Sequence, residues 1–203
     1  MRLILASASP RRADLLRAAG YVFDTIAADV DESIRAGELP SVYVRRLAAD
    51  KSAAALRTLT AGATANPPAE PFRPDDVVVL GADTTVVVDG EILGKPRDDA
   101  DAAGMLRKLS GKRHEVLTGV SLRHGAYEVG RVETTAVYVR ALSEDELSWY
   151  AASGEGRDKA GGYAVQGLAS RFIPRIDGSY SNVVGLPVAC VADLLRSLLA
   201  SRL

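Results

Sequence analysis

The sequence predicts an α/β fold, and three observations support this prediction. Short apolar runs of strand length, at residues 2–6 and 77–80, alternate with segments such as 42–56 whose apolar residues recur at helical spacing. Two segments rich in β-branched residues flank Gly125 and indicate long antiparallel strands. The chain has 203 residues, the size of one large domain or a closely fused pair. We therefore expect a mixed sheet with helices, in one compact body or in two lobes around a cleft.

The composition excludes several classes of protein. Hydrophobic residues at 47% and charged residues at 25% are typical of globular domains and exclude disorder and coiled coil. The net charge of −1 argues against a nucleic-acid partner, which usually requires a basic excess. No apolar stretch reaches the roughly 18 residues of a membrane span, and the run at residues 3–6 is too short for a signal peptide. Cys190 is the only cysteine, which indicates a reducing, cytoplasmic location.

The first half of the chain predicts alternating strands and helices. In order, we expect a strand, a helix, a strand, a helix and a loop at residues 2–6, 13–19, 22–27, 42–56 and 58–74. The last of these segments is rich in Ala, Thr, Pro and Gly and lacks periodicity, which is typical of a loop.

The second half begins with a strand at residues 77–80, which we expect to end at residues 81–84. The pair Asp89-Gly90 then predicts a tight hairpin between strands at residues 85–88 and 91–93. Ser143 and Glu146 have the spacing of a capping box, which predicts the start of a helix that runs to about residue 152. The remaining elements are expected to be a helix, two antiparallel strands, an irregular Gly-rich stretch and a closing helix, at residues 100–109, 114–122, 128–139, 154–180 and 188–199.

The first candidate site lies where the first strand gives way to a helix. Ser9 and Pro10 are typical of the N-cap and the first helical position, so a helix start with unpaired N–H groups is expected there. Such a start attracts phosphate. Ser7 adds a hydroxyl group, and Arg11 and Arg12 add two guanidinium groups that can reach different oxygens. An ordinary capped helix with surface arginines is the alternative.

Acidic residues provide the second candidate. Asp83 follows a buried strand and two small residues, where a carboxylate can hold Mg²⁺, position a water molecule or accept its proton. A solvated turn aspartate is the alternative. Of the pair Asp31-Glu32, one carboxylate could join a metal shell, although a solvated pair explains it equally well. Asp89 is explained by the hairpin turn alone.

Two lysines and a Gly-rich stretch complete the candidates. Lys51 lies on the expected helix 42–56, and Lys95 precedes Pro96, which stiffens the loop that would aim the lysine at a phosphate. Gln166 closes the Gly-rich stretch 158–167 and offers a donor and an acceptor for a base edge. Solvated lysines and a flexible loop are the alternatives.

Other motifs lead to negative conclusions. The stretch 90–96 has too few residues between its glycines for a Walker A loop, and residues 154–156 lack the third glycine of a dinucleotide fingerprint. His114 and His124 are too few for a zinc or triad site, so we expect structural or surface roles.

Taken together, these residues resemble the Maf family of nucleoside triphosphate pyrophosphatases. The resemblance spans nearly the whole chain, through LILASASPRR (3–12), VDES (30–33), RLAADKSAA (46–54), LGADTTVVVDGEILGKPRD (80–98), MLRKLSGKRHEVLTG (105–119), DKAGGYAVQG (158–167) and NVVGLPV (182–188). It implies one domain over residues 1–203, with a fold related to the ITPase-like pyrophosphatases and a deep cleft between two lobes. It also implies hydrolysis of a nucleoside triphosphate to the monophosphate and pyrophosphate, with a divalent metal, Mg²⁺ or Mn²⁺.

Carried over residue by residue, the resemblance assigns the catalytic roles. It implies that the triphosphate is handled by Ser7, Arg12, Lys51 and Lys95. Asp83 would then be the catalytic proton acceptor, and Glu32 would help it to hold the metal.

Three further positions separate the subgroups of the family, and here they are Arg11, Thr84 and Gln166. They are similar to the branch that acts on dTTP and UTP, whereas the 7-methyl-GTP branch is expected to carry an aromatic residue, Gln and Glu. Gln166 would read the carbonyl and N3–H edge of the pyrimidine, a pattern that cytosine does not present.

Two other functions remain open at this point. The chain could be a non-enzymatic nucleotide-binding regulator of cell division, which would bind a nucleotide and leave it intact. A phosphatase that acts on monophosphates would release orthophosphate and would not need the extended basic set. Members of the family are often dimers, so a homodimer is an option, but nothing in the sequence identifies an interface.

Overall fold

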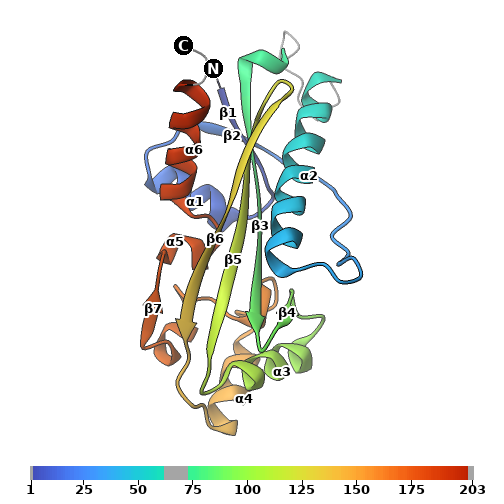
Figure 1. Cartoon of the computed structure of the whole chain (residues 1–203). Coiled ribbons are helices and arrows are strands. Elements are labelled where there is room, and N and C mark those ends of the chain that lie inside the picture. The colour runs from blue at the N-terminus through green and yellow to red at the C-terminus, as the bar shows by residue number, and fades with distance from the viewer. Residues whose placement is uncertain (1, 62–72, 201–203) are drawn as a thin grey trace. The chain divides into compact units, whose positions relative to one another are not determined.

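The computed structural model describes residues 2–61 and 73–200 of the chain. Its sheet has the strand order β2-β1-β3-β5-β6-β7, and β4 pairs with β3 (Figure 1). The seven strands are β1 (Arg2–Ala6), β2 (Phe23–Ile26), β3 (Val77–Val88), β4 (Glu91–Leu93), β5 (Arg113–His124), β6 (Tyr127–Tyr138) and β7 (Arg175–Asp177). β1 is parallel to β2 and β3, whereas β4 and β7 are antiparallel to their neighbours, so the predicted mixed sheet is confirmed.

The helices lie between these strands in the sequence. The α-helices are α1 (Pro10–Ala18), α2 (Pro40–Thr60), α3 (Asp99–Leu109), α4 (Glu144–Ser153), α5 (Tyr180–Val184) and α6 (Val188–Ala200). Short 3₁₀ helices are present at Pro74–Asp76, Ala160–Gly162 and Leu168–Phe172. In the described part of the chain, no helix combines the length and the apolarity needed to cross a lipid bilayer.

The chain divides into two compact units. Unit 1 consists of the described residues within 1–83, 118–133 and 185–203, and unit 2 consists of residues 84–117 and 134–184. The long strands β3, β5 and β6 each contribute residues to both units.

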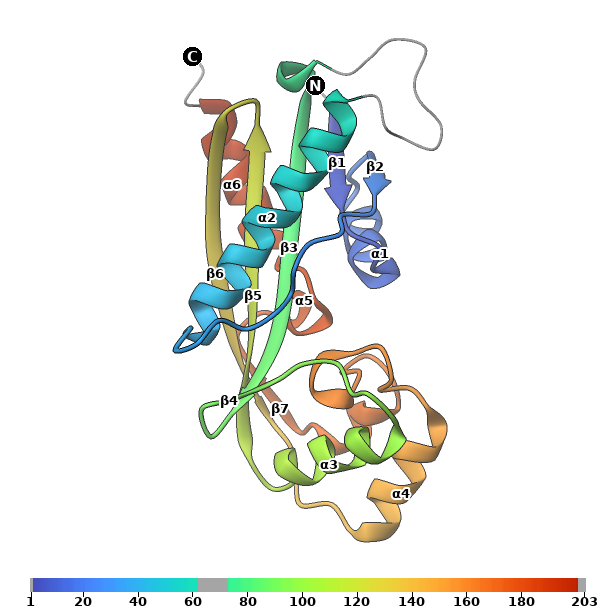
Figure 2. The same ribbon diagram turned by 90° about the vertical axis from the view of Figure 1, so that its right-hand side faces the viewer.

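Unit 1 is a sheet with a helical layer on each face (Figures 1 and 2). Because side chains alternate across a strand, Ile4 and Val79 pack with α2, whereas Leu5 and Leu80 pack with α1 and α6. Strands buried on both faces explain the continuous apolar runs in the sequence.

Two glycines let α2 lie directly on the sheet. A Cβ atom on Gly81 would stand 2.1 Å from the carbonyl oxygen of Ala48, and one on Gly119 would stand 2.1 Å from the carbonyl oxygen of Val44. Both distances are far below van der Waals contact, so only glycine permits this approach. The contact fixes α2 against β3 at the position from which its side chains can meet those of the strand.

Unit 2 has its own core, built by α3, α4 and the halves of the long strands that belong to it. Leu106, Leu147, Tyr150 and Phe172 are among its buried members. The predicted capping box at the start of α4 is confirmed, because the Ser143 and Glu146 side chains each accept a backbone N–H of the other residue.

The hairpin of β3 and β4 is confirmed as well. Asp89 and Gly90 both have positive φ, which the predicted tight turn requires.

Two predicted boundaries were wrong. The predicted strands 77–80 and 85–88 form one continuous strand, because sheet pairing and packing under α2 keep the residues between them extended. The predicted loop 58–74 also begins too early, because α2 extends through Thr60. Residues 62–72 of that loop lie outside the described residues.

Candidate active site

A cluster of three charged side chains, two of them buried, lies in unit 1. Lys51 Nζ lies 2.7 Å from Asp83 Oδ1 and 2.6 Å from Glu32 Oε1, so one ammonium group joins two carboxylates. The Lys51 and Asp83 side chains are 10% and 12% exposed, whereas that of Glu32 is 51% exposed. Charges this far from solvent are costly to fold unless they are paired. The cluster therefore lies where a functional site is expected.

The positions of these charges follow from the packing of α2 on β3. Gly81 and Asp83 are two residues apart on one strand and therefore face the same side, toward α2. The close approach at Gly81 brings Lys51 within reach of Asp83. The expectation that Asp83 emerges at the end of a strand is corrected: it lies in the middle of β3.

Arg12 lies beside this cluster and is held by the backbone. Its Nε donates to the carbonyl of Gly185 at 2.8 Å, and its Nη1 donates to the carbonyl of Ala82 at 2.8 Å and to Ser7 Oγ at 3.3 Å. Burial lowers the pKa of Arg12, and the charge of Arg11 lowers it further, while the charge of Asp83 counteracts both effects. The pairing of Ala6 with Gly81 across β1 and β3 explains why these residues come together.

The start of α1 is as the sequence predicts, with Pro10 in its first turn and Ser9 at the N-cap. The Ser9 side chain makes no capping hydrogen bond; instead its backbone N–H donates to Ser7 Oγ at 3.1 Å. The helix start is therefore not closed by its own cap, which agrees with the expected place for a phosphate.

Three residues of the site were not predicted. Tyr43, Arg46 and Glu38 tie the segment that carries Glu32 to α2. The Tyr43 hydroxyl donates to the Glu32 carbonyl at 3.0 Å. Burial, together with the charges of Asp83 and Glu32, raises the pKa of Tyr43 to about 12. The signal in the sequence is that Tyr43, Arg46 and Lys51 fall on one side of a helix.

Three of the remaining predicted site residues belong to unit 2, and their relation to Asp83 stays a prediction. Thr84 follows Asp83 directly and begins unit 2. Lys95 and Gln166 also belong to unit 2, and both are exposed. Arg11 lies in unit 1 next to Arg12 and is half-buried. His114 and His124 are buried, His114 against the hydroxyl of Tyr163 at 2.7 Å and His124 against the carbonyl of Val77 at 3.1 Å.

The donor set of the cluster fits a divalent metal of the Mg²⁺ type. Glu32 and Asp83 offer hard carboxylate oxygens at one point, and Mg²⁺ usually takes one or two protein carboxylates and completes its shell with water and substrate phosphates. Among residues 2–61 and 73–200, no group of three or more His, Cys, Asp or Glu side chains could hold a metal by itself. The residues present therefore suit a metal that the substrate helps to bind.

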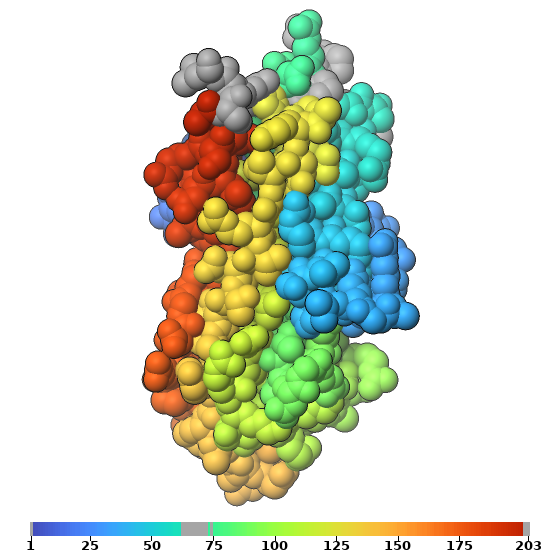
Figure 3. All heavy atoms as spheres, in the orientation of Figure 1, coloured from blue at the N-terminus to red at the C-terminus, as the bar shows by residue number. Residues whose placement is uncertain are grey.

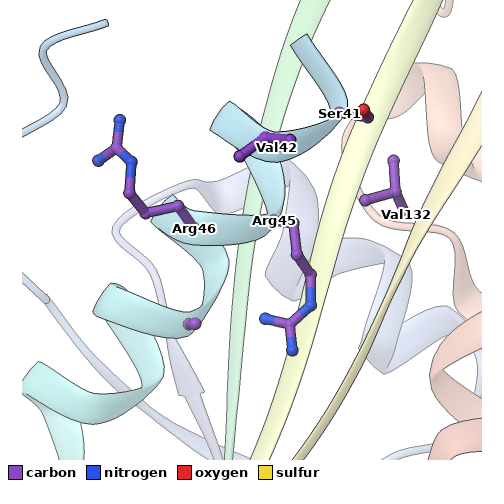
Figure 4. Close-up of a pocket in the computed structure, with 6 residues that line it drawn as sticks. Ser41, Val42, Arg45, Arg46 and Val132 are labelled. Atoms are coloured by element: carbon purple, nitrogen blue, oxygen red, sulfur yellow. The ribbon is translucent and has the colours of Figure 1, made fainter. Parts of the chain in front are cut away.

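Unit 1 also has an open groove of about 400 Å³ along the outer side of α2 (Figure 4). It is lined by Ser41, Val42, Arg45, Arg46, Ala49 and Val132. Figure 3 shows the same region from outside, where the blue start of α2 borders the yellow first half of β6.

A mixed sheet between helices, with a buried lysine joining two carboxylates beside a half-buried arginine, defines an α/β protein with a site suited to a phosphate anion and a divalent cation. The chain belongs to the Maf family, since the family model described as Maf-like protein matches residues 2–198.

Relatives of known name agree over nearly the whole chain. A protein of Cereibacter sphaeroides named dTTP/UTP pyrophosphatase is 50% identical over 198 residues, which cover 97% of this chain and 95% of the relative. Proteins with the same name from Hahella chejuensis and Vibrio cholerae are 48% and 46% identical, over 96% of this chain and 91% and 97% of their own lengths.

The solved structure of the Staphylococcus aureus Ham1 protein has a similar fold. It matches with a TM-score of 0.53 and 16% identity, and the match covers 100% of both chains. At this identity the likeness concerns the fold alone, and it confirms the predicted α/β class.

Proposed function

We propose that the chain is a nucleoside triphosphate pyrophosphatase that hydrolyses dTTP and UTP to the monophosphate and pyrophosphate. The observation that carries the proposal is the buried cluster of Lys51, Asp83 and Glu32 beside Arg12, in a chain about half identical to proteins named dTTP/UTP pyrophosphatase. A phosphoryl site needs fixed cations and one acidic group that directs water, and unit 1 contains both.

Phosphate binding is assigned to the start of α1 and to Arg12. A triphosphate carries about four negative charges at neutral pH, and the backbone N–H groups at a helix start favour such an anion. Arg12 is fixed by two backbone carbonyls and by Ser7, so it loses little conformational freedom when a phosphate binds. Arg11 and Lys95 are assigned to the same polyanion on the family resemblance.

Asp83 is assigned the water and its proton. Its Oδ1 already accepts from Lys51 at 2.7 Å, so the water is assigned to Oδ2. The water oxygen attacks the α-phosphorus, the bond to the bridging oxygen breaks, and pyrophosphate leaves with the bonding electrons while Asp83 takes the proton. A carboxylate held by a fixed ammonium group is oriented before the substrate arrives, which is the main contribution of positioning to such a reaction.

A divalent cation at Glu32 and Asp83 would supply charge neutralisation to the phosphate oxygens. Thr84 and Gln166 are assigned to recognition of the base. The predicted cleft, the single catalytic domain made of both units, the cytoplasmic location and a homodimer stay predictions.

The test is a panel of nucleoside triphosphates with Mg²⁺ or Mn²⁺, in which pyrophosphate and orthophosphate are measured separately. We expect pyrophosphate from dTTP and UTP and much slower turnover of CTP. Release of orthophosphate would indicate a phosphatase, and binding without hydrolysis would indicate a regulator; either result contradicts the proposal. Equal rates with dTTP and CTP would contradict the assignment of Gln166.

A further inference from the structure

The Glu32 carboxylate contacts Lys51 although the segment that carries Glu32 has no regular secondary structure. Residues 27–39 connect β2 to α2 without helix or strand, and the Glu32 side chain is half exposed. Its Oε1 nevertheless lies 2.6 Å from Lys51 Nζ. Holding an irregular segment in one conformation costs entropy at each residue, so other contacts must compensate.

Arg46 makes the strongest of these contacts. Its Nε donates to Glu38 Oε1 at 2.6 Å and its Nη2 donates to Glu38 Oε2 at 2.7 Å, the two-point geometry that only arginine can make. The same Nη2 donates to the carbonyl of Ser33 at 3.0 Å, one residue after Glu32. The Glu38 and Arg46 side chains are only 5% and 13% exposed, so water screens this ion pair little.

The segment adds contacts of its own to this ion pair. The N–H of Arg35 donates to Glu38 Oε2 at 3.1 Å, and the N–H of Glu38 donates to the carbonyl of Arg35 at 3.0 Å. Hydrogen bonding from Arg46 lowers the pKa of Glu38 to about 2, so the carboxylate stays charged. These hydrogen bonds link residues 33–38 to one another and join both ends of that stretch to Arg46 of α2.

We propose that the Arg46–Glu38 pair is a positioning device that sets the Glu32 carboxylate against Lys51 and thereby governs nucleotide turnover. The inference rests on the proposed function, because it assigns these residues to the same reaction. Neither Arg46 nor Glu38 contacts the reacting atoms in this assignment; both act through Glu32. Arg46 and Lys51 both belong to α2. The Arg46–Glu38 pair therefore fastens the segment that carries Glu32 to the same helix that carries Lys51, the ion partner of Glu32.

The alternative is that Arg46–Glu38 is merely one more ion pair that stabilises unit 1. The chain offers a matched control, since the neighbouring Arg45 donates its Nη2 to both oxygens of Glu128 at 2.8 Å. Figure 4 shows the guanidinium groups of Arg45 and Arg46 leaving α2 in different directions. The Arg45–Glu128 pair joins α2 to β6 and does not touch the segment 31–38.

The experiment compares Glu38→Gln and Arg46→Met with Glu128→Gln and Arg45→Met. Glu38→Gln keeps the shape of the side chain, so it serves if Arg46→Met fails to fold. Two quantities are measured for each variant: amide hydrogen exchange over residues 31–38 without metal or nucleotide, and kcat and KM for dTTP with Mg²⁺. Glu38→Gln is also combined with Glu32→Gln in a double-mutant cycle.

We expect Glu38→Gln to lower kcat/KM about tenfold, because a displacement of about 1 Å in a catalytic group costs this much or more. In the Glu32→Gln background the same change should cost less than about twofold, since a residue that acts through Glu32 has nothing left to position. Exchange over residues 31–38 should rise in Glu38→Gln and stay unchanged in Glu128→Gln. Both control variants should keep the wild-type kcat/KM.

Independent, multiplying losses in the double-mutant cycle would overturn the proposal while leaving the proposed function intact. So would faster exchange over residues 31–38 with unchanged kinetics, or an equal loss of activity in Glu128→Gln. A wild-type protein that releases no pyrophosphate would refute the proposed function itself and the positioning role with it.

Discussion

Unit 1 buries charged side chains in contact with one another, whereas unit 2 buries neutral polar ones. In unit 1, Lys51 and Asp83 form an ion pair almost out of solvent. The buried polar residues of unit 2, within the described part of the chain, are Thr85, His114, Thr135 and Asn182. Burial, together with the charge of Arg113, lowers the pKa of His114 to about 4, so this residue is neutral at pH 7.

This difference in buried polar residues distinguishes the candidate site in unit 1 from the structural core of unit 2. The neutral pair of His114 and Tyr163 shares one hydrogen bond and carries no charge, although His114 Nδ1 is buried without a partner. A buried ion pair is often no more stable than apolar residues of the same size, so stability alone does not explain Lys51 and Asp83. Buried ion pairs of this kind are expected at functional sites, and the pair of Lys51 and Asp83 lies in unit 1.

The largest expected effect is on catalysis. We expect Asp83→Asn to lower kcat/KM for dTTP by about 10²- to 10⁴-fold, because an amide cannot accept the proton of the attacking water. The free energy of unfolding should change by less than about 1 kcal/mol, since the shape is kept and Lys51 retains Glu32 as an ion partner at 2.6 Å. Pyrophosphate release, coupled to a colorimetric phosphate assay, measures the loss.

The matched control for this substitution is Asp89→Asn in unit 2. Asp89 is exposed and occupies the hairpin turn with φ of 51°, a conformation that asparagine accepts. It should keep the wild-type activity. An Asp83→Asn protein with normal turnover would exclude Asp83 as the base and would remove the functional reason for the buried charge.

A second prediction compares the cost of breaking the buried pair in each unit. Lys51→Met should lower the free energy of unfolding by about 3 kcal/mol, because Asp83 stays buried without its closest cation. Tyr163→Phe in unit 2 should cost only about 1–2 kcal/mol, the usual effect of leaving a neutral group unpartnered. Urea-induced unfolding at pH 7 measures both.

The double variant Lys51→Met/Asp83→Asn sharpens this test. It removes both charges, so it should recover most of the stability that Lys51→Met loses. If Lys51→Met is as stable as the wild type, the cluster is not electrostatically coupled and the contrast between the units fails.

Some of the interactions tested here can be predicted from the sequence, and others cannot. The elements themselves followed from local patterns: the turn at Asp89-Gly90, the capping box at Ser143 and the apolar runs each act over a few residues. The full length of β3 did not follow, because Gly81 and Asp83 have low strand propensity and are held extended by the neighbouring strands and by packing under α2.

The same limit applies to the site. The resemblance named Lys51, Asp83 and Glu32, and their contact in space agrees with it. The roles of Tyr43, Arg46 and Glu38 were missed, since they depend on how an irregular segment folds back on a helix. The sequence of residues 27–39 has no periodic pattern that predicts how this segment packs against α2. Only the tertiary structure shows this packing.

A third prediction concerns pH and is specific to unit 2. The pKa of His114 falls from 6.5 in the unfolded chain to about 4 in the folded protein. Between these values the unfolded state binds a proton that the folded state excludes, so stability is complete above pH 6.5 and declines as the pH falls toward 4. At pH 5 the loss should be about 2 kcal/mol.

The measurement is urea unfolding of the wild type and of His114→Leu at pH 7.5 and pH 5. For each protein, the quantity compared is the difference between its free energies of unfolding at pH 7.5 and at pH 5. That difference should be smaller in His114→Leu by about 2 kcal/mol. The same pH difference in both proteins would show that His114 is not the neutral buried group described above.

The smallest expected effects distinguish the two helix starts. Ser143→Ala should destabilise the protein by about 1 kcal/mol, because the Ser143 hydroxyl accepts the N–H of Glu146 at 3.2 Å. Ser9→Ala should change the free energy of unfolding by less than about 0.5 kcal/mol, since the Ser9 side chain caps nothing.

Both values are within reach of careful urea unfolding on matched samples. An equal cost for the two substitutions would mean that α1 is capped like α4, and that its first N–H groups are already satisfied within the protein. The expected inequality means that the Ser143 side chain caps α4, whereas the Ser9 side chain does not cap α1. Adding inorganic pyrophosphate should then raise the thermal midpoint of the wild type and of Ser9→Ala by the same amount, because Ser9 contributes only backbone to the start of α1.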